Sequence, residues 1–354
     1  MTRLRFREAY RDIELYEPGR LPVEIDLSDN TNLFGVPPSA RAVLNALADS
    51  TITRYPSVFA RSLKQVLAAR HGVLPENIVT GCGSDDVIDS ALRAFCEPGD
   101  RVAYPSPTFG VVSTFARMNA ALPVAVPMAA DFSFTTDDLV AANARVTYVC
   151  SPNNPTGTVA ANRQIEELDR RLSGMLLLDE AYADYSDQDF GAFVAASAHT
   201  VSLRTFSKVF GLAGLRVGYA IGPAAIIHEI EKSRGPYKVG AVAEAAAIEV
   251  VRSDGEWVVA VASRTKANRA RLAAVLAANG VRAWPSNGNF LLVQLPDNFT
   301  AVGTNAALRE HGVAVRPFPV LPHAGECIRV TVGPWDMMLR FLDAFSMVLG
   351  GKPV

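Results

Sequence analysis

The central part of the chain, residues 59–251, alternates short apolar segments with helical patterns. Leu63 and Leu67 share one face of a predicted helix, and Gly72 is placed to end it. The apolar segments have no polar face, as expected of strands that are covered by helices on both sides. We predict these strands at residues 78–80, 101–104, 124–126, 146–150, 175–179, 200–203 and 217–221. This alternation predicts an α/β fold with a mostly parallel, mixed sheet flanked by helices.

The pattern changes after Glu256. A long helical segment rich in alanine and arginine runs to Ala278, and Gly280 ends it. Further elements are predicted at residues 290–295 (strand), 301–311 (helix), 313–316 (strand), 328–332 (strand) and 335–349 (helix). This part of the chain predicts a smaller α+β domain. The segment before the alternating region has little periodicity and is expected to form an arm, whose docking partner the pattern does not identify.

Length and charge narrow the class of protein. The length of 354 residues favours two domains. The sum of 34 Lys and Arg against 36 Asp and Glu gives a net charge of −2, so the chain has no overall basic field. No apolar segment reaches the roughly 20 residues of a membrane span, and the charged N-terminus does not resemble a secretory signal. We therefore expect a cytoplasmic protein with no nucleic-acid or membrane partner.

The cysteines and histidines form no recognisable metal-binding pattern. Cys82, Cys96, Cys150 and Cys327 include no CxxC pair, and the histidines show no HExxH-type spacing. We expect four single buried thiols and no metal site.

A glycine-rich turn, Gly81–Asp86 (GCGSDD), joins a predicted strand to a predicted helix. Such a turn offers the backbone N–H groups and the positive dipole of the helix start to an anion, commonly a phosphate. The alternative is a plain turn in which Ser84 caps the helix, and the motif alone does not decide between the two. Its spacing is not the GxGxxG of a dinucleotide site.

Two further motifs end predicted strands. Residues 151–157 (SPNNPTG) follow a strand at the edge where open α/β sheets bind ligands, although the same residue types are common in turns. Asp179 ends the apolar segment LLLD. A carboxylate there can bind a metal, a ribose hydroxyl or a ring nitrogen, and its alternative role is to cap the next helix.

A lysine follows the strand predicted at residues 200–203. Lys208 lies in the segment TFSKVFGLAGLRVGY, among small and apolar residues. Desolvation lowers the pKa of a lysine and makes its amine a usable nucleophile. Because most lysines are exposed surface residues, this motif carries weight only together with the others.

Together the motifs supply the parts that pyridoxal phosphate requires: a Schiff-base lysine, a carboxylate facing the ring nitrogen and a phosphate cup. In chain order these parts are the turn at 81–86, Phe109, Asn154, Asp179 with Tyr182, Lys208 and Arg216. The motifs SPNNPTG, LLLDEAY and TFSKVFGLAGLRVGY resemble those of the fold-type I pyridoxal-phosphate aminotransferases, classes I and II. The resemblance extends over essentially the whole chain. It implies the fold of that class and transaminase activity.

The resemblance also implies a role for each site residue. Lys208 is expected to hold the cofactor and to shuttle the proton of the reaction, and Asp179 to keep the ring nitrogen protonated. Asn154 and Tyr182 are expected to bond the ring hydroxyl, and Phe109 to stack on the ring.

The resemblance places a set of polar side chains around the cofactor phosphate, namely Ser84, Asp85, Thr205, Ser207 and Arg216. Tyr55 is expected to reach this phosphate from a neighbouring subunit. The resemblance thus implies a homodimer with shared active sites.

Within the superfamily the chain is most like the histidinol-phosphate aminotransferases. The motifs that carry this likeness are LYEPG at 15–19, RYP at 54–56, RAFCEPG at 93–99, LRTFSK at 203–208 and IRVTVG at 328–333. The implied reaction converts histidinol phosphate and 2-oxoglutarate to imidazole-acetol phosphate and glutamate. Arg329 is expected to bind the substrate anion, and further candidate substrate-binding residues are Arg316, Tyr16 and Asn32.

One departure from the family pattern leaves the substrate open. The family's Asn-Glu-Asn-Pro is replaced here by Asn30-Thr31-Asn32-Leu33, in a segment that borders the substrate pocket. The alternatives are an aromatic amino-acid aminotransferase, a lyase similar to threonine-phosphate decarboxylase, and a binding module without catalysis. The complete set of lysine, aspartate and arginine argues against the last.

The order of the motifs also divides the chain. We predict an N-terminal arm at residues 1–45 that joins the small domain. A large cofactor-binding domain follows at residues 46–255, and a small C-terminal domain at residues 256–354.

Overall fold

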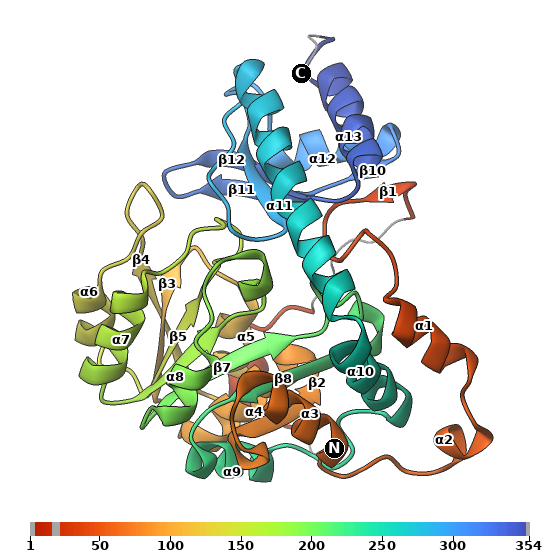
Figure 1. Ribbon diagram of the computed structural model, residues 1–354. Coiled ribbons are helices and arrows are strands. Elements are labelled where there is room, and N and C mark those ends of the chain that lie inside the picture. The colour runs from red at the N-terminus through yellow and green to blue at the C-terminus, as the bar shows by residue number, and fades with distance from the viewer. Residues whose placement is uncertain (1–3, 16–21, 352–354) are drawn as a thin grey trace.

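The computed structural model describes residues 4–15 and 22–351 (Figure 1). Its largest sheet has seven strands, which are β2 Ile78–Cys82, β3 Arg101–Ser106, β4 Leu122–Pro127, β5 Val146–Cys150, β6 Met175–Asp179, β7 Thr200–Thr205 and β8 Val217–Ile221. They lie in the order β2-β8-β7-β6-β5-β3-β4. Strand β8 is antiparallel to both neighbours, and the other pairs are parallel. The predicted mostly parallel, mixed sheet is therefore confirmed.

Helices cover both faces of this sheet. They are α3 Arg61–His71, α4 Gly83–Phe95, α5 Val111–Met118, α6 Thr136–Ala141, α7 Asn162–Arg171, α8 Gly191–Ala196, α9 Ala224–Ser233 and α10 Ala241–Ser253. Successive side chains of a strand point to opposite faces. On β6, Met175 and Leu177 belong to an apolar cluster with α4, α5 and α9, whereas Leu176 and Leu178 belong to a cluster with α3, α7 and α10. This two-sided burial explains the unbroken apolar segments of the sequence.

The long helix α11, Gly255–Ala278, leads from the larger part of the molecule to a smaller one (Figure 1). The elements that follow it are β9 Phe290–Gln294, α12 Ala301–Glu310, β10 Val313–Ala314, β11 Arg316–Leu321, β12 Gly325–Thr331 and α13 Trp335–Val348. Strands β11, β12 and β9 form an antiparallel sheet. None of the helices in the described ranges has the length and apolar character needed to cross a membrane.

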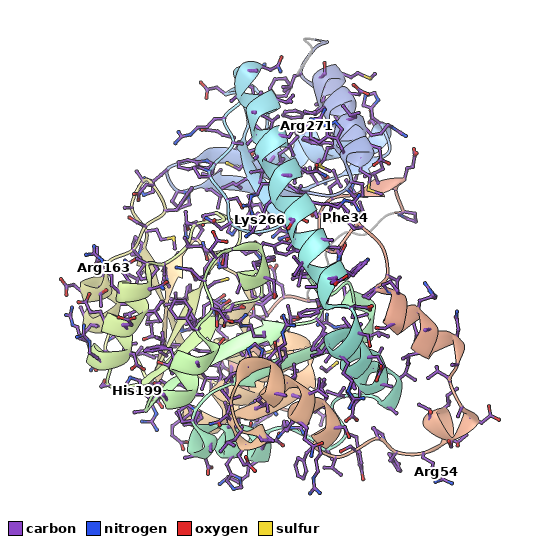
Figure 2. The ribbon with its side chains drawn as sticks, in the orientation of Figure 1. Phe34, Arg54, Arg163, His199, Lys266 and Arg271 are labelled. Atoms are coloured by element: carbon purple, nitrogen blue, oxygen red, sulfur yellow. The ribbon has the colours of Figure 1, made fainter. Side chains whose placement is uncertain are left out.

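The N-terminal segment docks on the smaller part. The short elements outside the two main groups are η1 Glu8–Tyr10, β1 Ile25–Asp26, α1 Pro38–Asn45, α2 Asp49–Thr53, η2 Pro75–Asn77, η3 Ala183–Tyr185 and η4 Ala213–Leu215. Strand β1 pairs in parallel with β10, and Leu27 is fully buried in the apolar cluster of the smaller part. Phe34 then lies beside α11, where the guanidinium of Arg264 is 4.6 Å from its ring centroid (Figure 2). The boundaries of the predicted arm and of the two predicted domains stay a prediction.

One strand prediction differs from the structure in an informative way. Strands β5, β6 and β8 have the predicted bounds, but the single strand predicted at residues 313–316 is divided into β10 and β11. The interruption is at Val315, whose backbone N–H donates to Oδ1 of Asn305 at 3.0 Å. The side chain of Asn305, on α12, thus accepts the hydrogen bond of a backbone N–H that a continuous strand would use for pairing.

Two local predictions near the glycine-rich turn are wrong. Helix α4 already begins at Gly83, so Ser84 lies inside its first turn and is not the N-cap. The N–H of Cys82 is instead bonded to Oδ2 of Asp86 at 3.0 Å. Cys82 is also exposed, and Cys96 is partly buried, whereas Cys150 and Cys327 are buried as expected.

Candidate active site

The predicted site residues collect at one edge of the seven-stranded sheet. Strands β2, β3, β5, β6 and β7 run in the same direction, so the loops that follow them leave from the same edge. Strand β8 runs the opposite way and therefore begins at that edge. For this reason Arg216, directly before β8, joins residues that directly follow the parallel strands.

Arg216 lies over the start of α4. Its Nη2 is 3.1 Å from Oδ2 of Asp85, and its Nη1 donates to Oγ of Ser207 at 3.4 Å. The N–H of Ser207 donates in turn to Oγ1 of Thr205 at 3.1 Å. Gly83 has φ +81, and a Cβ there would lie 2.5 Å from Nη2 of Arg216, so a larger residue would displace the guanidinium.

A second glycine keeps β8 close to the same helix start. A Cβ on Gly218 would lie 2.3 Å from the backbone nitrogen of Ser84, so only glycine allows this approach. The resulting cradle combines N–H groups of a helix start, hydroxyls and a guanidinium. These are the donors that bind a phosphate group.

Lys208 is partly buried in the middle of the site. Its Nζ donates to the carbonyl oxygen of Asp29 at 3.2 Å and lies 5.3 Å from the ring centroid of Tyr182. Burial, and after it the nearby charge of Arg329, lower the pKa of Lys208 to about 8. The amine is therefore easier to deprotonate than that of an ordinary lysine.

Asp179, at the end of β6, is a buried carboxylate with two donors. Oδ2 accepts a hydrogen bond from the hydroxyl of Tyr148 at 2.6 Å, and Oδ1 accepts one from the N–H of Ala181 at 3.0 Å. Burial raises the pKa of Asp179, and the two hydrogen bonds act in the opposite direction. The alternative role considered from the sequence is wrong, because the N-cap of the next helix, η3, is Tyr182, and Asp179 only closes the turn at Ala181.

Arg329 extends from β12 of the smaller part toward the same edge. Its Nη1 donates to Oδ1 of Asn154 at 2.5 Å, and its Nη2 donates to the carbonyl oxygen of Ser28 at 2.5 Å. The guanidinium lies 5.6 Å from the ring centroids of both Phe290 and Phe318. Arg329 is buried, and it links the smaller part, the arm and the loop after β5.

The other predicted residues have mixed positions. Phe109 is partly buried and packs against the cluster that contains α4 and α5. Arg316 is the cross-strand neighbour of Arg329. The amide of Asn32 donates to the carbonyl of Val209 at 2.8 Å, so this side chain fixes the arm to the segment after Lys208. Tyr16 lies outside the described residues.

Within its own chain, Tyr55 lies on the surface, apart from the site residues described above. It is 84% exposed and stacks on Tyr237 with ring centroids 4.9 Å apart. It follows α2, beside Arg54, in a segment that projects from the body of the molecule (Figure 2).

The structure adds two residues that the sequence reasoning did not select. Asn30 is buried with φ 54, and its Nδ2 donates to the hydroxyl of Tyr182 at 3.0 Å. Tyr148 bonds Asp179 as described. The alternation of side chains along β5, which places Tyr148 on the same face as Cys150, was the signal that could have indicated Tyr148.

The fold and this site are those of a pyridoxal-phosphate-dependent transferase of fold type I. The model of the family described as aminotransferase class I and II matches residues 22–345, so the chain belongs to this family.

Curated relatives and solved structures agree with this assignment. The chain is 32% identical to histidinol-phosphate aminotransferase 1 of Nostoc sp., over 98% of this chain and 99% of the relative. It is 36% identical to histidinol-phosphate aminotransferase of Roseiflexus castenholzii, over 93% and 91%. A crystal structure of histidinol-phosphate aminotransferase from Sinorhizobium meliloti, in complex with pyridoxal-5'-phosphate, superposes with a TM-score of 0.87 at 25% identity, covering 98% of this chain and 97% of that one.

The lowered pKa of Lys208 predicts how its reactivity depends on pH. An amine reacts with acylating reagents only when it is deprotonated, so the labelling rate of Lys208 in the cofactor-free protein should rise with pH and reach half of its maximum near pH 8. Labelling with acetic anhydride, followed by peptide mass spectrometry, measures this rate, and Lys208→Arg identifies the signal. A midpoint at the ordinary lysine value of 10.5 would contradict the description of the site.

Proposed function

We propose that this aminotransferase moves the amino group of histidinol phosphate to 2-oxoglutarate, giving imidazole-acetol phosphate and glutamate. The observation that carries the proposal is a second cation beside the Lys208 site, the buried Arg329, in addition to the exposed Arg216. Arg216 serves the phosphate cradle on α4, whereas Arg329 enters from β12 and contacts Asn154. Two separate anion sites suit a phosphorylated cofactor and an anionic substrate. The names of the curated relatives support histidinol phosphate as that substrate.

The cofactor is pyridoxal 5'-phosphate, and the residues present fit it. Its phosphate matches the cradle of Arg216, Ser207 and the start of α4, which glycine at positions 83 and 218 leaves open. Asp179 supplies a buried carboxylate for the ring nitrogen, and Lys208 the amine that holds the cofactor. When bound, pyridoxal phosphate supplies the electron sink for amino-group transfer.

The chain's own residues then provide binding and proton transfer. A lysine with a pKa of about 8 can both accept and return a proton near neutral pH, so Lys208 can move the proton between the reacting carbon atoms. Oδ1 of Asn154 accepts a hydrogen bond from Arg329, so Nδ2 of Asn154 can donate to the ring hydroxyl of the cofactor. The amide of Asn30 donates to the hydroxyl of Tyr182 and so positions Tyr182 for the same hydroxyl of the cofactor ring.

Arg329 orients the substrate. A guanidinium binds a carboxylate or phosphate through two parallel hydrogen bonds. Both terminal nitrogens of Arg329 face oxygen acceptors at this edge of the site, so the guanidinium is oriented for such binding. The rings of Phe290 and Phe318 exclude water from the guanidinium, which strengthens its attraction for an anion. Phe318, which is partly exposed beside Arg329, also suits an aromatic side chain, so an aromatic amino acid is the second candidate substrate.

A substrate panel decides between these candidates. The purified holoenzyme should convert 2-oxoglutarate to glutamate fastest with histidinol phosphate as amino donor, because that donor supplies the anion for Arg329. Phenylalanine is the comparison donor, because it offers Arg329 an α-carboxylate in place of the phosphate. Dominant turnover of phenylalanine would assign an aromatic aminotransferase, and release of carbon dioxide from phosphothreonine without a 2-oxo acid would assign a lyase. Either result overturns the proposal.

We also propose that the enzyme is a cytoplasmic homodimer in which Tyr55 completes the phosphate site of the partner subunit. Tyr55 and Ile52 are 84% and 70% exposed on the projecting segment around α2, which is typical of side chains that are covered by another chain. The cysteine side chains of the described residues are all unpaired thiols, as in a reducing compartment.

Hybrid dimers test the shared site. Tyr55→Ala and Lys208→Ala subunits with different tags are coexpressed, and dimers that carry both tags are purified. If Tyr55 acts across the interface, the hybrid has one complete site and is more active than either variant alone. If the hybrid is no more active than the Tyr55→Ala dimer, Tyr55 does not act across the interface. A monomeric wild-type protein would contradict the dimer itself.

A further inference from the structure

The partner that holds the carboxylate of Asp179 comes from the neighbouring strand. In the parallel pair of β5 and β6, Cys150 is the Cα partner of Asp179, and Tyr148 is the partner of Leu177. Tyr148 therefore lies two residues before Cys150 on the same face of the sheet. Its long side chain reaches along that face, and its hydroxyl is 2.6 Å from Oδ2 of Asp179.

The hydroxyl of Tyr148 lies beside two groups, the carboxylate of Asp179 and the thiol of Cys150. The thiol of Cys150, the other polar group beside it, donates to the carbonyl oxygen of Pro152 at 3.3 Å. Tyr148 is fully buried, and burial raises its pKa well above 10, so the phenol stays protonated and acts as a donor. The acceptor is the carboxylate of Asp179.

We propose that Tyr148 is a positioning residue for the cofactor: its hydroxyl fixes Oδ2 of Asp179 and keeps this carboxylate ionised where it meets the ring nitrogen. The inference rests on the proposed use of pyridoxal phosphate. The N–H of Ala181 holds Oδ1 from the other side, so the carboxylate cannot rotate. Each carboxylate oxygen accepts more than one hydrogen bond, so a held carboxylate still has room for the ring nitrogen.

The other charged and titratable groups around Asp179 do not replace this contact. Asp85, at the start of α4, raises the pKa of Asp179, and Lys208, after β7, lowers it. Tyr148 is the side chain that donates a hydrogen bond to this carboxylate. Without its hydroxyl, burial and Asp85 would favour the protonated acid, which offers no negative charge to a protonated ring nitrogen.

The test is the pH dependence of cofactor affinity. Cofactor-free full-length protein is titrated with pyridoxal phosphate at several pH values, and the Kd is read from the absorbance of the bound cofactor. In Tyr148→Phe, the Kd at neutral pH should rise roughly ten-fold, as expected for loss of a hydrogen bond to a charged group. The acid midpoint of binding should move up by about one pH unit, because Asp179 protonates earlier. Titration of the cofactor itself is the same in every variant and cancels in the comparison.

Tyr219→Phe is the matched control. Tyr219 is a buried tyrosine of the same sheet, but its hydroxyl lies 3.0 Å from Nε2 of His71. Its replacement should leave the acid midpoint unchanged. If Tyr148→Phe also leaves the midpoint unchanged, even with a weaker Kd, the contact is merely structural and the inference is wrong.

A second variant covers the case in which Tyr148→Phe does not fold. 3-Fluorotyrosine at position 148 keeps the ring and is a stronger donor, so it should move the acid midpoint down. An unmoved midpoint overturns the inference. Wild-type protein that binds no pyridoxal phosphate would overturn the proposed function, whereas normal wild-type binding with unmoved variants overturns only the role of Tyr148.

Discussion

The site depends on the removal of two opposite charges from water, the partly buried Lys208 and the buried Asp179, at one edge of the seven-stranded sheet. Burial lowers the pKa of the lysine and raises that of the aspartate, so each group is brought closer to neutral pH. Such groups are costly unless hydrogen bonds hold them. The carbonyl of Asp29 and the hydroxyl of Tyr148 supply these bonds. The free-energy cost of burial thus falls at the site where the proposed proton transfer uses Lys208.

The proposed second anion site is formed where the two parts of the molecule are in contact. Arg329 belongs to the smaller part, but its guanidinium contacts Asn154 of the larger part and Ser28 of the arm. Asn30, from the same arm, contacts Tyr182. The arm pairs with β10 and buries Leu27, so its position relative to the smaller part is fixed by packing. The arm therefore joins the proposed substrate-binding Arg329 to the proposed cofactor-binding Tyr182.

The sequence predicts the large sheet and the cofactor cradle because their signals are local. Asp179 is the last residue of β6 and Lys208 lies in the loop after β7, and parallel strands bring such positions together. The arm contacts could not be predicted in this way. Asn30 and Tyr182 are 152 residues apart, and no periodic pattern connects them. The division of residues 313–316 into two strands was missed for the same reason, since it depends on the side chain of Asn305.

The central claim is that Lys208 is the lysine that holds pyridoxal phosphate. Borohydride reduction of the purified holoenzyme fixes the cofactor on its lysine, and peptide mass spectrometry then locates it. The account predicts the label on the peptide that contains Lys208 and its loss in Lys208→Arg. Lys238, whose Nζ is 2.6 Å from Asp86 beside the cradle, is the most informative competitor. Label on Lys238 or other lysines, with none on Lys208, would contradict the account.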